Sequence, residues 1–322
     1  MRITKLSENF TPLRNGIFFS IDTENDTPAD LSVEVVNCLT NEVVATQTLH
    51  GVISTTVNIA PYIELPDTYT PKHLAQTTLM DAPTATYKIR CCDIESERVI
   101  VSVNRNKLTD RTALITSLPS SRRIAYGDND EMLIISKPHE SLSVEIVTDT
   151  DESLRLAHSS ITGASIFTLS LEDFEHDIRA LDIFIYDESE ELAHMHYVVT
   201  PRRRTAVRLA WLSDGGSIEH YTFPVSHREF REVEKLQILQ ATEPQTISCK
   251  VMQFITVCSR YEPHSTISAL AQIASSPKVW LCEVDGSLQR VAVTTQRIEY
   301  NLLGTPDAVV FELCLWQEEV AL

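Results

Sequence analysis

Apolar and polar residues alternate one by one along much of this chain, and this pattern constrains the fold more than any other feature of the sequence. Residues Leu31 to Val35 show it (Leu-Ser-Val-Glu-Val), as do residues 142–146 and 181–185. Successive side chains of an extended strand point to opposite faces of a sheet, so each segment predicts a strand with one buried face. Strand patterns also occur at residues 43–49, 52–59, 85–92, 97–104, 131–136, 192–199, 207–212, 218–223, 246–258, 278–284, 288–295 and 308–316.

Turn residues separate these strands at short intervals, and helical patterns are rare. Asp285-Gly286 is the strongest hairpin signal, because aspartate and glycine supply the positive φ angles of a type I′ turn. Residues 263–276 have apolar residues at helical spacing and are followed by Pro277, which predicts one short helix. Many short strands with few helices predict a mainly β protein of two or three antiparallel β-sandwich or barrel domains, with that helix in the last domain.

Breaks in the strand pattern divide the chain into three predicted domains. A polar stretch at residues 104–110 ends the first, a β-sandwich domain over residues 1–107. Pro201 and the arginines after it end the second, a β-sandwich domain over residues 108–201. The third, over residues 202–322, is a β domain that contains the helix.

Residues 60–83 are too rich in proline for a continuous sheet, with prolines at positions 61, 66, 71 and 83. We interpret them as a long excursion from the first domain. Large apolar side chains on a loop usually mark a contact surface, so this segment is predicted to bind a partner or another copy of the chain. Its candidate contact residues are Tyr62, Leu65, Tyr69, Leu74 and Leu79.

The chain carries 45 acidic and 27 basic side chains, a formal net charge of −18. Such a charge disfavours binding to nucleic acid, because few cations are left to neutralise phosphates, and it disfavours a polybasic membrane-binding surface. The first ten residues lack the apolar run of a signal peptide, and no segment approaches the roughly 18 apolar residues of a membrane-spanning helix. We therefore expect synthesis in the cytoplasm, with neither nucleic acid nor membrane as a partner.

Glycine is scarce, with eight residues in 322, and phosphate-binding loops and nucleophile elbows draw on glycine. No motif of either kind occurs. The seven cysteines are an odd number without the spacing of a disulfide scaffold or a zinc site, which indicates free thiols. We therefore expect no catalytic residue, no cofactor and no metal required for folding.

Four groups of charged or metal-ligating residues stand out in the sequence. His194 and His196 share one strand face and would offer two ligands to a metal, but the sequence places no third ligand. The acidic residues within 127–131 and 149–152 are predicted to be solvated hairpin tips, since neither matches a calcium-binding loop. The arginines at 202–204 suit a linker or a contact to an acidic neighbour better than a phosphate site.

The segment 207–223 reads as two strands around a Ser-Asp-Gly-Gly turn. With Asp214-Gly215 as the loop, Trp211 would lie opposite Ile218, and Gly215 would take the positive φ of the turn. Both faces of this hairpin are apolar, so we expect it to be covered on both sides and to be structural. Its motif residues are Trp211, Gly215, Gly216, Tyr221 and Phe223.

This segment resembles uncharacterised proteins of Bacteroidales phages and prophages, in which a Trp-Leu-Asn-x-x-Gly-Gly segment is followed by Tyr-x-Phe. Here Ser213 replaces the asparagine. Residues 267–281 are similar to the helix and the Ser-Pro-x-Val-Tyr-Leu strand of that family, and 290–300 to its closing strands. Residues 121–128 also resemble the middle of such chains. The resemblance covers the last 120 residues best and hardly extends to residues 1–105. Proteins of this kind are taken as virion or tail components.

The resemblance thus implies a non-enzymatic structural component of a phage particle, located in the virion after synthesis in the host cytoplasm. The expected role is a tail, tail-tip or neck adaptor protein that assembles as a homo-oligomeric ring and contacts other virion proteins. Two alternatives remain open. One is a carbohydrate-binding or receptor-binding tail module, and the other is an adaptor of a contractile injection apparatus.

Overall fold

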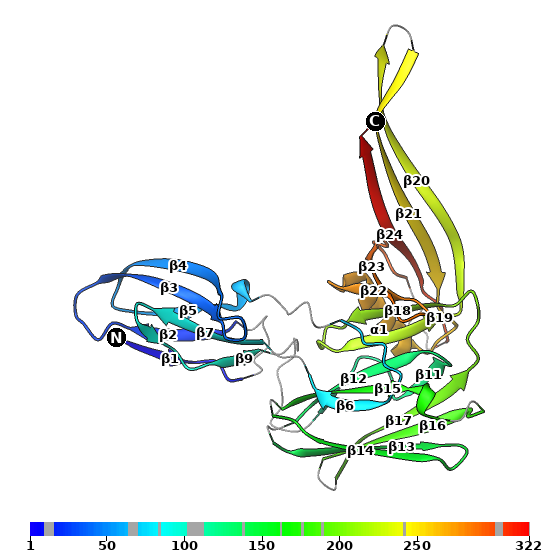
Figure 1. Cartoon of the computed structure of the whole chain (residues 1–322), viewed down its shortest axis with the longest axis horizontal. Coiled ribbons are helices and arrows are strands. Elements are labelled where there is room, and N and C mark those ends of the chain that lie inside the picture. Colours follow the sequence, from blue (N-terminus) through cyan, green and yellow to red (C-terminus); the bar gives the residue numbers. More distant parts are fainter. Residues whose placement is uncertain are drawn as a thin grey trace.

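The computed structural model describes the whole chain except residues 10–15, 64–69, 83–84, 102–112, 137–138, 162, 175–176, 188–189, 241–242, 300–304 and 322. The described residues form a mainly β protein with several antiparallel sheets and one α-helix, which confirms the predicted fold class. The first domain lies to one side, and the second and third domains pack together into what we call the body (Figure 1).

The first domain is a sandwich of two sheets. One has the order β1-β2-β5, and the other has the order β4-β3-β7-β8, with β9 also paired to β7. Alternate residues of each strand point between the sheets, so that Phe19, Val33 and Ile89 are fully buried together. The strands are β1 (Arg2–Lys5), β2 (Phe18–Asp22), β3 (Ala29–Asn37), β4 (Val43–Val52), β5 (Ser54–Asn58), β7 (Ala85–Cys91), β8 (Ile94–Glu95) and β9 (Val99–Val101), with a 3-10 turn η2 (Ala60–Tyr62) after β5.

The second domain is also a sandwich, with sheets of order β10-β12-β15-β6 and β11-β17-β16-β13-β14. The pairing is antiparallel except between β11 and β17, which are parallel. Their facing residues form one apolar core. The elements are β10 (Ala113–Ile115), β11 (Ser121–Ala125), β12 (Asn129–Ile135), β13 (Ser141–Thr148), β14 (Ser153–Ser159), β15 (Ala164–Ser170), η3 (Leu171–Asp173), β16 (Ala180–Asp187) and β17 (Glu190–Thr200), together with β6 (Thr78–Asp81).

Strand β6 corrects the prediction that residues 60–83 leave the first domain only as a loop. Thr78 to Asp81 pair antiparallel with β15, at the edge of a second-domain sheet. The chain therefore leaves the first domain after β5, adds a strand to the second, and returns to the first at β7. A four-residue strand whose residues are all half-buried shows no clear alternation, which is why the sequence pattern did not reveal it.

The third domain is a seven-stranded sheet of order β19-β18-β22-β23-β24-β21-β20. Only Pro224 separates β19 from β20, so the two outermost strands meet at one end and the sheet curls around its own core. Helix α1, which the sequence predicted, fills that core with Ile267, Leu270 and Ile273. The elements are β18 (Val207–Leu212), β19 (Ile218–Phe223), β20 (Val225–Gln240), β21 (Glu243–Cys258), α1 (His264–Ser275), β22 (Val279–Cys282), β23 (Leu288–Val293) and β24 (Val310–Ala321).

The sheet containing β12 and β15 is covered on both faces. Every residue of these two strands is buried. Met132 and Phe167 point into the second-domain core, whereas Leu133 and Ile166 point toward Leu212 of the third domain. A sheet buried on both sides shares its two faces between two cores, so the second and third domains act as one packed unit.

The hairpin of β18 and β19 is buried on both sides as its sequence predicted, but the predicted register was wrong by one residue. Trp211 lies opposite Glu219, and Leu212 lies opposite Ile218. The turn is longer than expected, because the Ser213 amide donates to the Ser217 carbonyl at 2.9 Å. The positive φ of the turn is at Gly216 (85°) rather than at Gly215. A one-residue slip exchanges the faces, so Trp211 packs with Tyr221 and Phe223 on the α1 side.

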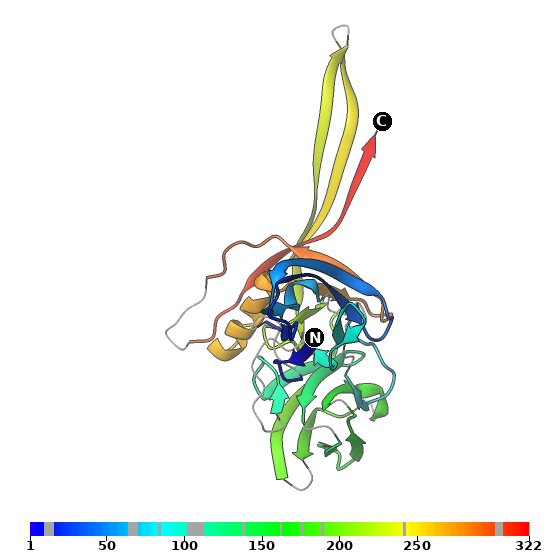
Figure 2. The same cartoon turned by 90° about the vertical axis from the view of Figure 1, so that its left-hand side faces the viewer.

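Strands β20, β21 and the end of β24 project far beyond the body, and we call this three-stranded ribbon, from residue 228 outward, the arm. It stands clear of the rest of the molecule in both views (Figure 1 and Figure 2). Each strand of its hairpin has 16 residues, which corresponds to a length of about 50 Å. None of the described helices is long and apolar enough to span a membrane.

Candidate functional site

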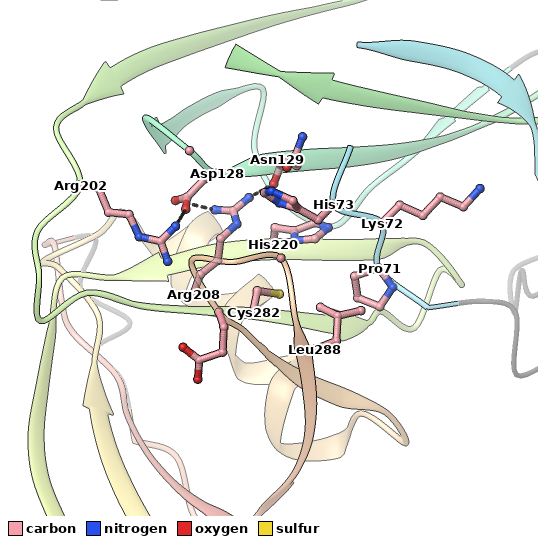
Figure 3. Close-up of a pocket in the computed structure, with 13 residues that line it drawn as sticks. Pro71, Lys72, His73, Asp128, Asn129, Arg202, Arg208, His220, Cys282 and Leu288 are labelled. Carbon is pink, nitrogen blue, oxygen red and sulfur yellow. Dashed lines mark hydrogen bonds and ion pairs between the residues drawn. The ribbon is translucent and has the colours of Figure 1, made fainter. Parts of the chain in front are cut away.

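The acidic segment at 127–131 was predicted to be a solvated hairpin tip, but its acidic side chains are buried. Asp128, Asp130 and Glu131 are only 2 to 3% exposed. They lie at the start of β12, where the sheet containing β12 and β15 meets the third domain. Figure 3 shows Asp128 at this place. The prediction failed because the cations that accompany these carboxylates come from distant parts of the sequence.

Asp128 is held by two arginines. Arg202 Nη1 donates to its Oδ1 at 2.7 Å, and Arg208 Nη1 donates to its Oδ2 at 3.3 Å. The Thr222 hydroxyl donates to the same Oδ2 at 2.7 Å, and Arg208 also donates to the backbone carbonyl of Asn129. The predicted contact between the arginine run and an acidic neighbour therefore exists for Arg202, within the chain itself.

Asp130 and Glu219 flank a third arginine. The Nη1 atom of Arg122 lies 3.5 Å from Asp130 and 3.9 Å from Glu219, and all three side chains are at most 5% exposed. The Tyr197 hydroxyl donates to Asp130 at 2.5 Å, and Ser217 donates to Glu219 at 2.7 Å. Burial raises the pKa of the Glu219 carboxyl, although Arg122 and the surrounding hydrogen-bond donors act against that rise.

Glu131 faces a buried histidine. Its Oε2 lies 3.4 Å from His220 Nε2, and its Oε1 accepts the backbone amide of Lys72 at 3.0 Å. Burial by itself would lower the pKa of His220, but hydrogen bonds with Cys282 and Glu131 outweigh it and raise the pKa to about 9. His220 is therefore a cation at neutral pH.

We call these groups the charge cluster: the carboxylates of Asp128, Asp130, Glu131 and Glu219, and the cations of Arg122, Arg202, Arg208 and His220. Four acidic side chains thus meet four basic ones in a buried place. Buried ion pairs add little net stability compared with apolar packing, but removing one partner is costly because it leaves a buried charge uncompensated. The cluster thus fixes how the second and third domains dock.

Two clefts border this cluster. The first, drawn in Figure 3, is lined by His73, Arg208 and Cys282 among others and has a volume of about 20 Å³, room for a single water molecule. The second has a volume of about 260 Å³ and lies between Arg123 and the first turn of α1, where Thr266 is buried. Asp128 beside the first cleft and Asp130 beside the second are paired with arginines, and Glu262 at the second cleft accepts a hydrogen bond from the Tyr221 hydroxyl at 2.9 Å.

The two histidines considered as metal ligands do meet a third group. Asp182 lies opposite His196 on β16, and its Oδ1 contacts His194 Nε2 at 2.7 Å and His196 Nδ1 at 3.0 Å. The described part of the chain nevertheless contains no group of three or more histidine, cysteine or carboxylate side chains arranged to hold a metal. The hydrogen bonds to the two imidazoles contribute to a lowered pKa of Asp182 against the opposing effect of burial.

Part of the candidate contact loop is used inside the molecule. Leu79 lies on β6 and packs against the second-domain core, and the Leu74 carbonyl accepts a hydrogen bond from Asn129 at 2.7 Å. Tyr62, in η2, is 38% exposed and is the one described candidate with an open surface. Leu65 and Tyr69 lie outside the described residues.

Both faces of the arm are exposed to solvent. Val233 and Leu236 are 50% and 60% exposed, and they lie on opposite faces because they are three residues apart on one strand. Nearer the body, Phe230 stacks on Phe254 with ring centroids 5.0 Å apart. Exposed apolar side chains on both faces of a ribbon with no covering layer are typical of a surface that contacts another molecule.

Sequence reasoning missed both the arm and the cations of the cluster. The segment 225–240 mixes charged and apolar residues on both faces, so neither strand nor helix periodicity stands out. A usable signal was the strand pattern at residues 246–258, which is much longer than the usual strand of five or six residues. The sequence contains no signal that pairs Arg122 or Arg208 with the acidic segment.

Comparison with known proteins finds only remote structural similarities. No protein-family model and no curated protein sequence matches this chain. Among solved structures, Dpr2 Ig1-Ig2 in complex with DIP-Theta Ig1-Ig3 is 7% identical, with 98% of this chain and 88% of that chain covered and a TM-score of 0.21. The chicken CNTN1 FN1-FN3 domains are 8% identical, with coverages of 80% and 91% and a TM-score of 0.23. The surface layer protein SbsC, domains 4-9, is 11% identical, with coverages of 99% and 46% and a TM-score of 0.22.

Scores this low carry no argument about function. What the fold and the described site define is a class: a mainly β protein built from antiparallel sandwiches, with a charge-paired body and a projecting β arm.

Proposed function

We propose that this protein is a non-enzymatic structural subunit of a phage particle, a tail, tail-tip or neck adaptor that assembles with copies of itself as a ring. The observation that carries the proposal is the arm. The similarity of residues 207–223 to phage and prophage proteins gives the proposed setting.

The physical argument concerns the stability of the arm in water. A two-stranded hairpin is at best marginally stable by itself, and the outer end of the arm is such a hairpin, because β24 pairs with β21 only from Ser248 to Cys258. Exposed apolar side chains such as Val233, Leu236 and Ile247 gain stability when a neighbouring subunit buries them. The net charge of −18 keeps the free subunit soluble until then.

Burial of the two described tryptophan side chains supports a structural role over sugar binding. Trp211 is fully buried and Trp280 is 5% exposed, so neither presents an open ring face on which a sugar could stack. The charge cluster points the same way, since its carboxylates serve arginine and histidine side chains of the same chain.

Two measurements on the full chain test the proposal. Mass spectrometry of purified particles is expected to find the protein, and electron microscopy of the concentrated protein is expected to show rings. Val233→Ser and Leu236→Ser together are expected to weaken assembly, while the control pair Leu39→Ser and Ile161→Ser, at sites 85% and 67% exposed away from the arm, is expected to leave it unchanged. Absence from particles together with a monomer at every concentration would contradict the proposal.

A further inference from the structure

The outer edge of β20 carries a run of charges whose order is symmetric. Residues Arg228-Glu229-Phe230-Arg231-Glu232 read plus, minus, aromatic, plus, minus. Read backward, the same five positions give minus, plus, aromatic, minus, plus, so each charge is inverted about Phe230. Within the described residues, β20 pairs only with β21, and its other edge has no strand beside it.

We propose that β20 is a self-recognition edge, which pairs antiparallel with β20 of a second copy about a two-fold axis at Phe230. In this register Arg228 lies opposite Glu232 of the other copy, and Glu229 lies opposite Arg231. Residues directly opposite each other in an antiparallel pair project from the same face at about 5 Å, where opposite charges attract. The symmetry repeats each contact, so the two copies form four ion pairs.

Neighbouring registers are rejected by the same charges. A shift by one position places Arg228 opposite Arg231 in one direction, and Glu229 opposite Glu232 in the other. Moving the axis to the next residue on either side makes Glu229 or Arg231 face its own copy. Each alternative sets like charges directly opposite, which destabilises a pair, so the sequence favours one alignment.

The residue on the proposed axis suits this role. Phe230 is half-buried and stacks on Phe254 at an interplanar angle of 10°. In the pair, Phe230 of each copy lies opposite its equivalent, so two stacked aromatic pairs meet at the centre of the interface. Aromatic cross-strand pairs are among the more stabilising ones in sheets.

The alternative explanation is that the charges only protect an open edge from pairing. Edge protection works with charges of one sign, such as a row of lysines, which repel every approaching strand of the same kind. Here the net charge of the five residues is zero, and their order attracts one particular strand, namely an identical one. This inference rests on the proposed function, in that it names a self-contact of the assembling subunit. A two-fold contact joins subunits in pairs, so ring closure would use a different surface.

Charge reversal in the full-length protein tests the register. Glu229→Arg places two arginines opposite each other, and Arg231→Glu places two glutamates opposite each other, so each variant is expected to self-associate roughly tenfold more weakly in analytical ultracentrifugation. The double variant exchanges the two charges and is expected to restore association. An equimolar mixture of the two single variants is expected to form mixed pairs, because each then supplies the charge that the other lacks.

The control is Glu145→Arg, a reversal of the same size on β13, where Glu145 lies opposite Arg155 within the chain. It is expected to leave association unchanged, and thermal unfolding checks that every variant is folded. Single variants that associate like the wild type, or folded single variants that fail to form mixed pairs, would overturn the inference. Such a result leaves particle incorporation, which tests the proposed function, unaffected.

Discussion

Arg208 offers the sharpest test of the charge cluster, because it connects the two domains of the body and is only 4% exposed. It donates to Asp128 and Thr222 and lies 3.6 Å from Asp130. In Arg208→Ala the carboxylate of Asp128 keeps Arg202 and Thr222 but loses one of its two cations. Asp130 loses a nearby cation as well.

Breaking a buried ion pair by removing one partner costs about 3–5 kcal/mol. That is a large share of the roughly 5–15 kcal/mol by which a domain is stable. Arg297 provides a matched control, since it pairs with Glu299 at 2.5 Å but the two side chains are 81% and 72% exposed. Solvent screens such a pair, so Arg297→Ala is expected to cost less than about 1 kcal/mol.

Urea unfolding followed by tryptophan fluorescence measures the difference, because Trp280 lies in the apolar cluster between the two domains and reports their separation. In a double-mutant cycle, Arg208→Ala combined with Asp128→Ala should cost less free energy of unfolding than the sum of the two single variants. The reason is that each single variant leaves the other residue of this ion pair buried without that partner. If Arg208→Ala were no more destabilising than Arg297→Ala, the cluster would not hold the domains together.

Three further predictions follow from buried groups. His220 has a folded pKa of about 9, above its unfolded value, so its contribution to folding stability is complete below about pH 6.5 and is lost as the pH rises through 9. This loss amounts to up to about 3 kcal/mol, and His220→Gln should flatten it when urea unfolding is measured as a function of pH. An unchanged profile would contradict the prediction. Trp211→Ala should destabilise the third domain by about 3–5 kcal/mol, seen as a lower melting temperature, whereas a normal melting temperature would refute its role in the core. Gly216→Ala should cost about 1 kcal/mol in thermal unfolding because its φ is positive, while Gly215→Ala, the neighbouring control, should cost less.

The sequence predicted the strands well wherever one face is buried and the other is not. At Ala85–Cys91, alternate residues are buried along the whole strand, and the predicted range 85–92 differs from it by one residue. Helix α1 was predicted equally well, because Pro277 ends a clear apolar stripe. Such patterns are local and need no knowledge of the partner.

Features that depend on a distant partner were not predictable in this way. The segment 128–131 is polar in sequence and buried in the structure only because Arg122, Arg202 and Arg208 reach it. The register of the 207–223 hairpin depended on whether the turn had two or more residues, and two adjacent glycines left that choice open. Charges surrounded by solvent and charges matched in a core have the same sequence signature.

Strand β6 also has a consequence for the order of synthesis. Met80 pairs with Ile166, so β6 leaves the ribosome well before β15 and waits without a partner while most of the second domain is made. The two segments that flank it belong to the first domain, which can close its own sandwich once β9 has emerged. During translation the first domain therefore carries a tethered, unpaired strand, and the second domain becomes complete only when its growing chain captures that strand from its neighbour.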